Sequence, residues 1–242
     1  MSDTEILRTY YNAYHEPRYR YLLDLIAGYI DKETPRVLDI GRSRLTDLIH
    51  ESYHVPVDSL GFGSDSQSNT GNHFEFDLNH AQERGKWRQG IPIYRLVIMA
   101  EVIEHLHTAP EHVLKFIAGL LQEDGVLILQ TPNAVSLSRR FKMLMGRNPY
   151  EMIREDDSNP GHFREYTLDE LTGIAKTTGY RVEQYSFRYY FDGRFARHKN
   201  PGDEPQAVIG GMKNLAGRLL PPRLRSGITV VLRKKTCCRI EN

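Results

Sequence analysis

The chain has 242 residues, of which 40% are hydrophobic and 26% are charged, and its formal net charge at pH 7 is +1. This composition is that of a globular protein, and the length suits one large α/β domain. The two cysteines, Cys237 and Cys238, are neighbours, which excludes a disulfide framework. Because the sequence also lacks a signal-peptide core and an apolar run of about 20 residues, it predicts a cytoplasmic protein.

Positive charge is concentrated towards the C-terminus. Residues 181–239 contain thirteen Lys and Arg and only four acidic residues, a net charge of +9, so the remaining residues carry −8. A basic segment of this kind predicts an anionic partner: a phosphate-bearing substrate, a nucleic acid or a membrane surface. A solvated surface that balances the acidic part of the chain explains the same pattern.

Residues 1–35 predict an N-terminal helical cap, with apolar residues at helical spacing in 4–15 and 18–31. From residue 36 to 242, short apolar runs alternate with segments of helical periodicity. The predicted strands are 36–41, 54–61, 73–79, 94–100, 125–131, 180–187 and 226–234. The predicted helices between them are 45–52, 109–122 and 168–178, the last two opened by capping-box pairs, Thr108 with Glu111 and Thr167 with Glu170. Strands separated by helices indicate a parallel sheet with helices on both faces.

Two long connections, at about 132–166 and 188–225, interrupt this alternation. Long connections in a compact α/β domain are usually functional, and ligands of open α/β sheets bind at the carboxyl ends of the strands. We therefore expect both connections to form a roof over a site there. Residues 133–152 predict an amphipathic helix that packs its apolar side on the sheet and carries Arg139, Arg140 and Lys142 on the other side. The segment 214–227 could lie on a membrane, although Pro221 and Pro222 would break a long helix.

The segment VLDIGRSRL (37–45) predicts a ligand site after the first strand of the sheet. Gly41 would let the backbone approach a ligand closely, and the helix that follows offers unpaired N–H groups. Asp39 precedes this turn, and Asp58 ends the next strand, where a carboxylate can accept hydrogen bonds from ribose hydroxyls. An ordinary strand–turn–helix would give the same residues, so this pattern alone does not decide between the two interpretations.

The motifs VLDIG, VD, FDLN, EVIEHL, EDGVLILQTPN and ITVVLRK, taken in order, resemble class I S-adenosylmethionine-dependent methyltransferases. The resemblance covers about residues 36–187 and the last strand. It implies a Rossmann-like α/β fold, whose seven-stranded sheet is mostly parallel with an antiparallel last strand. It also implies a methyl-donor site at the strand tips. There Asp39 and Gly41 would contact the methionine and Asp58 the ribose, while the adenine would lie near Asp77 or Leu78 and the sulfonium near Ala100 or Glu101.

Ser43 departs from the pattern of this family, which usually has a second glycine at that position. Serine is small, so a close approach of the cofactor survives better than it would with a bulky residue. The resemblance therefore places Ser43 in the cofactor site. A non-catalytic relative that keeps the fold as a binding subunit is the alternative.

Two carboxylates and an imidazole follow the strand 94–100. Glu101, Glu104 and His105 have the i, i+3, i+4 spacing that puts side chains on one face of a helical turn. Two adjacent carboxylates repel unless a cation lies between them or one holds a proton. Oxygen ligands with one imidazole suit Mg²⁺ or Mn²⁺.

His162 supplies a fourth candidate ligand, in the segment GHFREYTLDEL (161–171). EVIEH followed by HFREYT resembles the metal-dependent O-methyltransferases of the quinone-pathway and small-RNA 2′-O-methyltransferase types. The resemblance implies that Glu101, Glu104, His105 and His162 hold one divalent cation, and that Glu104 and His105 take part in catalysis. A metal-free enzyme with His105 as general base, and a purely structural role for the histidines, remain open alternatives.

The run TPN…GRNPY…HFREYTLDEL most resembles methyltransferases encoded with glycan assembly. That resemblance implies a hydroxyl acceptor on a small molecule or glycan, carried on a phosphate or lipid. The basic segment 181–239 fits such a phosphate or a membrane surface, so peripheral membrane contact is a further expectation. RNA 2′-O-methylation is the alternative, but the sequence has no recognisable RNA-binding module or stacking platform. No pattern in the sequence predicts an oligomeric state.

Overall fold

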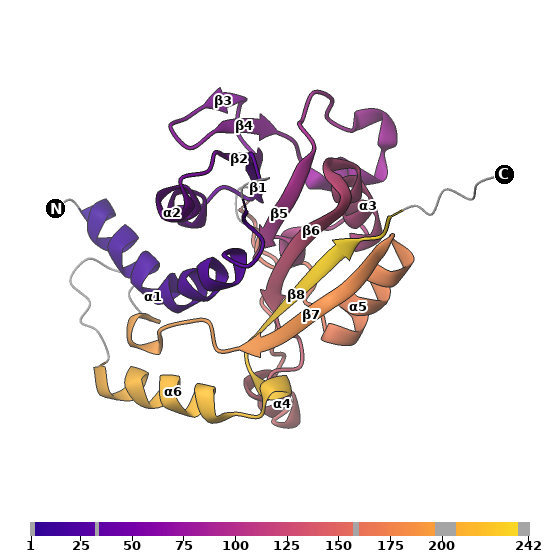
Figure 1. The fold of residues 1–242 in the computed structure, drawn as a ribbon. Helices are drawn as coiled ribbons and strands as arrows, with labels where there is room; N and C mark the ends of the chain where they lie inside the picture. The colour runs from indigo at the N-terminus through magenta and orange to yellow at the C-terminus, as the bar shows by residue number, and fades with distance from the viewer. Residues whose placement is uncertain (1–2, 32–33, 157–159, 197–206, 237–242) are drawn as a thin grey trace.

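The computed structural model describes residues 3–31, 34–156, 160–196 and 207–236, so Cys237 and Cys238 lie outside the described residues (Figure 1). The strands are β1 (Val37–Ile40), β2 (Val57–Gly61), β3 (Ser66–Gln67), β4 (Asn72–Glu75), β5 (Tyr94–Ala100), β6 (Leu121–Pro132), β7 (Tyr180–Arg188) and β8 (Gly227–Lys234). They form one sheet in the order β3-β4-β2-β1-β5-β6-β8-β7.

The helices are α1 (Asp3–Ile26), α2 (Arg44–Tyr53), α3 (Pro110–Leu120), α4 (Leu137–Leu144), α5 (Leu168–Thr177) and α6 (Ala207–Leu219). Short 3₁₀ turns are η1 (Leu78–Gln82), η2 (Arg84–Lys86), η3 (Ile103–His105), η4 (Gly193–Phe195) and η5 (Pro222–Leu224). Among the described residues, no helix combines the length and the apolar character needed to cross a membrane.

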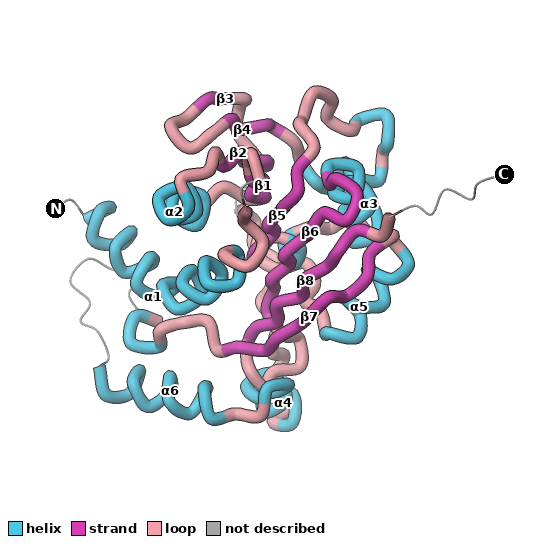
Figure 2. The backbone as a smooth tube through the Cα atoms, in the orientation of Figure 1, coloured by secondary structure: helices cyan, strands magenta, loops and turns pink. Residues whose placement is uncertain are grey.

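Strand direction follows the prediction. β4, β2, β1, β5 and β6 run parallel, and β8 is antiparallel to both of its neighbours, β6 and β7. The sheet has eight strands where seven were expected, because the two-residue strand β3 pairs with β4 at the edge (Figure 2). The sequence around β3 is short and polar, so it carries no apolar alternation that could have revealed a strand.

The two faces of the sheet bury separate apolar layers, because successive side chains of a strand point to opposite faces. Leu96 and Ile98 of β5 pack with Tyr19, Leu22 and Ile26 of α1 and with α2 on one face. Val97 and Met99 of the same strand pack with α3 and α5 on the other face. The predicted cap at 1–35 therefore shares its apolar contacts with β1, α2 and β5 through α1.

The N-terminal region forms a single helix, whereas two helices were predicted. α1 continues through Pro17, which lacks the N–H that would bond to the preceding turn. Tyr19, Leu22 and Ile26 are almost completely buried on the following turns. Full burial of one such side chain stabilises by about 1.5–3 kcal/mol, so three of them outweigh the about 3 kcal/mol cost of an interior proline.

One of the two expected capping boxes is present. Thr167 accepts from the N–H of Glu170, and the Glu170 carboxylate accepts from the N–H of Thr167, so α5 begins as predicted. The pair at α3 is absent, because Pro110 occupies the first helical position and makes Ala109 the N-cap. Thr108 lies one residue too early, and its buried hydroxyl has no partner in the described part of the chain.

The connections after β6 and β7 differ most from the predictions. Residues 133–152 were expected to form one long helix packed on the sheet, but α4 is eight residues long and its apolar side is exposed. The connection after β7 contains α6, which was not predicted, because Gly210, Gly211 and Gly217 lower the helix propensity of its sequence. Figure 1 shows α4 and α6 at one end of the molecule.

Candidate functional site

A cavity of about 830 Å³ lies at the carboxyl ends of β1, β2 and β5, a volume in the range of small-molecule sites. α1 forms one wall, and the loop that carries His162 forms another. The predicted cofactor and metal residues among its walls are Gly41, Ser43, Asp77, Leu78, Ala100, Glu101, His105 and His162. Asp39, Asp58 and Glu104 were also predicted to belong to the site, but they do not line this cavity.

Gly41 forms the turn between β1 and α2. Its φ is +82°, in the left-handed region that favours glycine. A Cβ at this position would lie 2.7 Å from Cγ2 of Val102, which is closer than packed carbon atoms approach. The turn therefore requires glycine for two reasons: its backbone conformation and the nearby side chain of Val102.

Ser43, at the position where the family usually has a glycine, has a structural role. It is the N-cap of α2: its hydroxyl accepts from the Leu45 N–H at 3.2 Å, and its own N–H donates to Oγ1 of Thr46 at 3.1 Å. A serine N-cap typically stabilises a helix by about 1 kcal/mol relative to alanine. Serine in this position fixes the start of α2 beside the cavity.

Asp39 lies beneath this turn instead of in the cavity wall. Its Oδ2 accepts from the Thr46 hydroxyl at 2.6 Å, and only 1% of the residue is exposed. Burial raises the pKa of Asp39 to about 7, against the opposing effect of the Thr46 hydrogen bond. We infer that Asp39 holds the N-terminus of α2 in place, a role that does not require contact with the cofactor.

The raised pKa of Asp39 predicts a loss of stability with rising pH. Its folded pKa of about 7 lies above the ordinary 3.8, so between these values the folded chain binds the proton more tightly. Stability from this group is therefore complete below about pH 4 and falls as pH rises towards 7. Asp39→Asn cannot ionise. In urea titrations, the unfolding free energy of both proteins is measured at pH 5 and pH 8. Its decrease over this range should be about 1–3 kcal/mol smaller in the variant than in the wild type. Equal losses in both proteins would contradict this assignment.

Asp58 occupies a different part of the sheet from the one predicted. It is the second residue of β2, and its carboxylate is fully engaged by Arg36 Nη1 at 2.8 Å, the Tyr94 hydroxyl at 2.9 Å and the Asn72 N–H at 2.8 Å. The carboxyl end of β2, where a ribose carboxylate was expected, is formed by Gly61 and the exposed Phe62. The predicted strand ended at the right residue, but Asp58 precedes its tip by three positions.

Asp77, the N-cap of η1, and Leu78, its first residue, line another part of the cavity. Asp77 Oδ1 accepts from the N–H of Asn79 at 2.9 Å, which fixes the start of the turn, and Leu78 is buried. The Asn79 side chain in turn accepts from the N–H of His107 at 2.9 Å. This wall is therefore tied directly to the segment that follows His105.

α1 contributes wall residues that the sequence did not identify as functional. Tyr11, His15 and Arg18 line the cavity, and their i, i+4, i+7 spacing is the signal that could have indicated a polar face of the predicted cap. Arg18 is only 4% exposed, and its Nε and Nη1 have no hydrogen-bond partner within the described residues. Burial, followed by the charge of Arg18, lowers the pKa of His15 to about 3, so this imidazole is neutral at pH 7.

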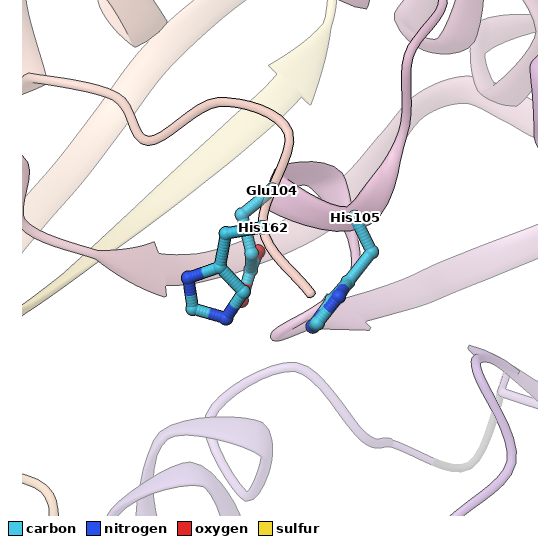
Figure 3. A group of neighbouring side chains, drawn as sticks. All are labelled: Glu104, His105 and His162. Carbon is cyan, nitrogen blue, oxygen red and sulfur yellow. The ribbon is translucent and has the colours of Figure 1, made fainter. Parts of the chain in front are cut away.

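Three of the four predicted metal ligands converge. Glu104, His105 and His162 each offer one ligand atom within 4.8 Å of the others, and Figure 3 shows the three side chains gathered in one place. Glu104 and His105 come from η3, directly after β5, and His162 comes from the long loop after α4. A backbone hydrogen bond holds the loop of His162 next to η3: the N–H of Phe163 donates to the Glu104 carbonyl oxygen at 2.8 Å.

Both histidines are oriented by acceptors at Nδ1. The Nδ1–H of His105 donates to the Gly161 carbonyl at 2.9 Å, and the Nδ1–H of His162 donates to Oε1 of Glu165 at 3.0 Å. In its neutral form, each ring therefore has its lone pair on Nε2. A carbonyl or carboxylate at the second ring nitrogen is the usual arrangement behind a metal-ligating histidine. Burial also lowers the pKa of His105, which favours its neutral form.

The two glutamates differ in their burial and in their surroundings, because Glu101 is only half-buried. Glu104 is fully buried. Its Oε2 accepts from the Thr131 hydroxyl at 2.9 Å, while its Oε1 has no partner among the described residues. Burial and the neighbouring Glu101 raise the pKa of Glu104. Glu101 has a φ of +57°, a strained conformation of the kind found at functional sites, and burial raises its pKa too. Glu101 lines the cavity beside the three converging residues without joining them.

Arg139 and Glu165 form the support of His162. Arg139 forms an ion pair with the Glu165 carboxylate and donates from Nη1 to the Asn133 carbonyl at 2.8 Å. The sequence placed Arg139 on a solvated or substrate-facing side of a roof helix, but only 18% of its side chain is exposed. Its structural role depends on a partner 26 residues away, which no local pattern indicates.

Comparison with known families and structures agrees with this fold. The family model of a methyltransferase domain matches residues 11–185 of the chain. No curated protein matches the sequence.

Among solved structures, a SAM-dependent methyltransferase from Archaeoglobus fulgidus is 15% identical over 91% of this chain and 94% of its own, with a TM-score of 0.56. A Haloferax volcanii protein, solved with the Trm112 methyltransferase activator, is 11% identical over 92% and 90%, with a TM-score of 0.57. The YcgJ protein from Bacillus is 13% identical over 90% and 99%, with a TM-score of 0.52. At these identities the likeness concerns the fold alone.

Proposed function

The chain belongs to the methyltransferase domain family, and from this membership we propose that it transfers the methyl group of S-adenosylmethionine to a hydroxyl of a small molecule or glycan. One observation carries the proposal. The glycine turn after β1 and the histidines of the Glu104–His105–His162 group open on the same cavity. A methyl donor held at the strand tips would thus lie next to groups that can activate an acceptor oxygen.

The cavity walls fit S-adenosylmethionine. The buried guanidinium of Arg18 offers an α-carboxylate donors that have no partner among the described residues, and the Gly41 turn lines the same cavity. Phe62, exposed at the tip of β2, offers an aromatic face to the nucleoside. Asp77 is a carboxylate of the wall that can accept from ribose hydroxyls, in the role predicted for Asp58.

Substitution of Arg18 tests this arrangement through ligand affinities, without a measurement of methyl transfer. Arg18→Met should weaken binding of S-adenosylhomocysteine by about 10- to 100-fold in calorimetry, because a charge-assisted pair contributes about 1.5–3 kcal/mol. Binding of methylthioadenosine, which lacks the carboxylate, should change little. Arg20→Met on the exposed side of the same helix is the matched control. An equal loss for both ligands would indicate a structural role for Arg18.

The donor set also fits a divalent cation. Glu104 offers a buried carboxylate oxygen that has no partner in the described part of the chain, and His105 and His162 offer Nε2 atoms oriented through Nδ1. Two imidazoles beside one carboxylate suit Mn²⁺ better than Mg²⁺, which prefers oxygen ligands. When bound, such a cation lowers the pKa of an acceptor hydroxyl and orients it. Thr131, Gly161 and Glu165 hold the three ligands in position.

A metal-free reaction is the second candidate. The tautomer that donates from Nδ1 to Gly161 leaves Nε2 of His105 able to accept a proton from the acceptor hydroxyl. The lowered pKa of His105 keeps this imidazole neutral at pH 7, as a general base requires.

The test is methyl transfer from labelled S-adenosylmethionine to a panel of glycans, catechols and RNA 3′ ends, with and without a chelator. Transfer to a glycan or catechol that chelator abolishes and Mn²⁺ restores is the expected result. Transfer that ignores chelator would favour the His105 mechanism, and transfer to RNA alone would replace the proposed acceptor. No binding of S-adenosylmethionine at millimolar concentration would leave only a non-catalytic binding role.

A further inference from the structure

α6 presents its apolar residues to the solvent and its small residues to the protein. The inward face is formed by Gly210, Asn214 and Gly217, at i, i+4, i+7 spacing. A Cβ on Gly210 would lie 2.4 Å from Cα of Arg194, and one on Gly217 would lie 2.5 Å from the Tyr189 ring. This face is therefore in such close contact with the chain that α6 cannot turn its apolar side inward without leaving its position.

The outward face of α6 is an apolar stripe. Val208, Met212, Leu215 and Leu219 recur at i, i+4, i+7, i+11 and are between 61% and 75% exposed. Lys213 and Arg218 are exposed and lie on either side of the stripe at helical spacing. Long basic side chains beside an apolar stripe can keep their charged ends in a polar layer while the stripe enters an apolar one.

α4 extends this surface at the same end of the molecule. Phe141, Leu144 and Met145 are at least 59% exposed, with Arg140 and Lys142 exposed among them. The start of α4 is tied to the chain that follows α6, because Nδ2 of Asn133 donates to the carbonyl oxygens of Arg223 at 3.0 Å and Arg225 at 2.8 Å. Figure 1 shows the two helices at this end of the molecule.

The charge of the α4–α6 surface identifies its partner. Residues 137–147 and 207–225 each contain four Lys or Arg and no acidic residue. Two copies of the chain that met through this surface would bring these cations together, which disfavours self-association. The segment 197–206 contains no large apolar side chain that could cover the stripe. We propose that α4 and α6 form a docking surface for an anionic lipid bilayer, on which the chain lies without crossing it.

This surface adjoins the site, because Arg139 of α4 is paired with Glu165, which orients His162. Docking would thus bring the loop of His162 close to the bilayer. Lipid binding itself does not rest on the proposed methyl transfer. Vesicle binding can be measured with the full chain whether or not an acceptor is known.

The experiment is flotation of the full chain with vesicles of phosphatidylcholine alone, or with about 30% phosphatidylglycerol. Binding to the anionic vesicles should be at least about tenfold stronger, and 0.5 M NaCl should weaken it by a similar factor. The double variant Met212→Glu and Leu215→Glu should lose binding at least about tenfold, while its S-adenosylmethionine affinity stays unchanged. Ile93→Glu, at an exposed apolar residue before β5, is the matched control and should bind like the wild type.

Several outcomes would overturn the proposal: no binding to anionic vesicles, equal binding to neutral vesicles, or equal loss in the Ile93→Glu control. A concentration-dependent dimer in light scattering that the double variant abolishes would assign the surface to a second copy instead. Because the substituted residues are exposed, circular dichroism of the variants should match the wild type and confirm that they are folded.

Discussion

Replacement of Glu104 by Gln is expected to lower the rate of methyl transfer by at least about 100-fold. The substitution keeps the shape of the side chain, so the Thr131 hydroxyl can still donate to the remaining oxygen. It removes the only carboxylate of the Glu104–His105–His162 group, and with it the negative charge that would hold a cation beside the two imidazoles. The S-adenosylmethionine affinity should change by less than about twofold, because Glu104 does not line the cavity.

The measurements are initial rates with and without added Mn²⁺, and Mn²⁺ binding followed by electron paramagnetic resonance. Glu155→Gln is the matched control and should keep wild-type values. Glu155 is exposed and lies in the same connection as His162, between α4 and α5. Thermal unfolding of both variants shows whether a buried amide has destabilised the fold.

A parallel substitution separates the two mechanisms. His105→Gln should abolish transfer whether His105 is a ligand or a base. Glu104→Gln should be equally damaging only if a cation is required, since a neutral His105 base needs no charge from Glu104. Activity that survives both Glu104→Gln and chelator would therefore refute the metal site. It would leave the proposed methyl transfer, with His105 as the base, in place.

The fold was largely predictable because its determinants are local. The runs around Leu38, Val97 and Ile128 are buried on both faces, and such strands are near-continuously apolar and easily located. β3 was missed because it is short and polar. α6 was missed because its glycines lower the helix propensity of its sequence, and its large apolar residues face the solvent instead of the core.

The site was predictable where its residues follow a strand directly, and not where they depend on distant partners. Gly41 follows β1, and Glu101 and His105 follow β5, so their position after a strand placed them in the cavity wall. Asp58 has the residue type expected for ribose but lies too early in its strand. Arg18 was missed because its burial and its position in the cavity wall follow from the packing of α1 in the folded chain. No local sequence pattern indicates them.

Replacement of Gly41 by Ala is expected to weaken S-adenosylmethionine binding by about tenfold or more and to destabilise the fold by about 1–3 kcal/mol. Alanine must adopt a φ near +82° or distort the turn, and its Cβ would meet Val102 Cγ2 at 2.7 Å. Calorimetry measures the first effect and urea unfolding the second. Gly173→Ala, in α5 with nothing near its Cβ position and no positive φ, should be neutral or slightly stabilising.

The contact with Val102 links the cofactor turn to the Glu104–His105–His162 group, because Val102 lies between Glu101 and η3. If the new methyl group pushes Val102 away, Gly41→Ala should lower the rate of transfer even at saturating S-adenosylmethionine. Adding Val102→Ala removes the collision but leaves the unfavourable φ, so it should restore part of the rate and little of the stability. Complete recovery of both would mean that space alone requires the glycine. No recovery of the rate would mean that the turn and the ligand group are not coupled through this contact.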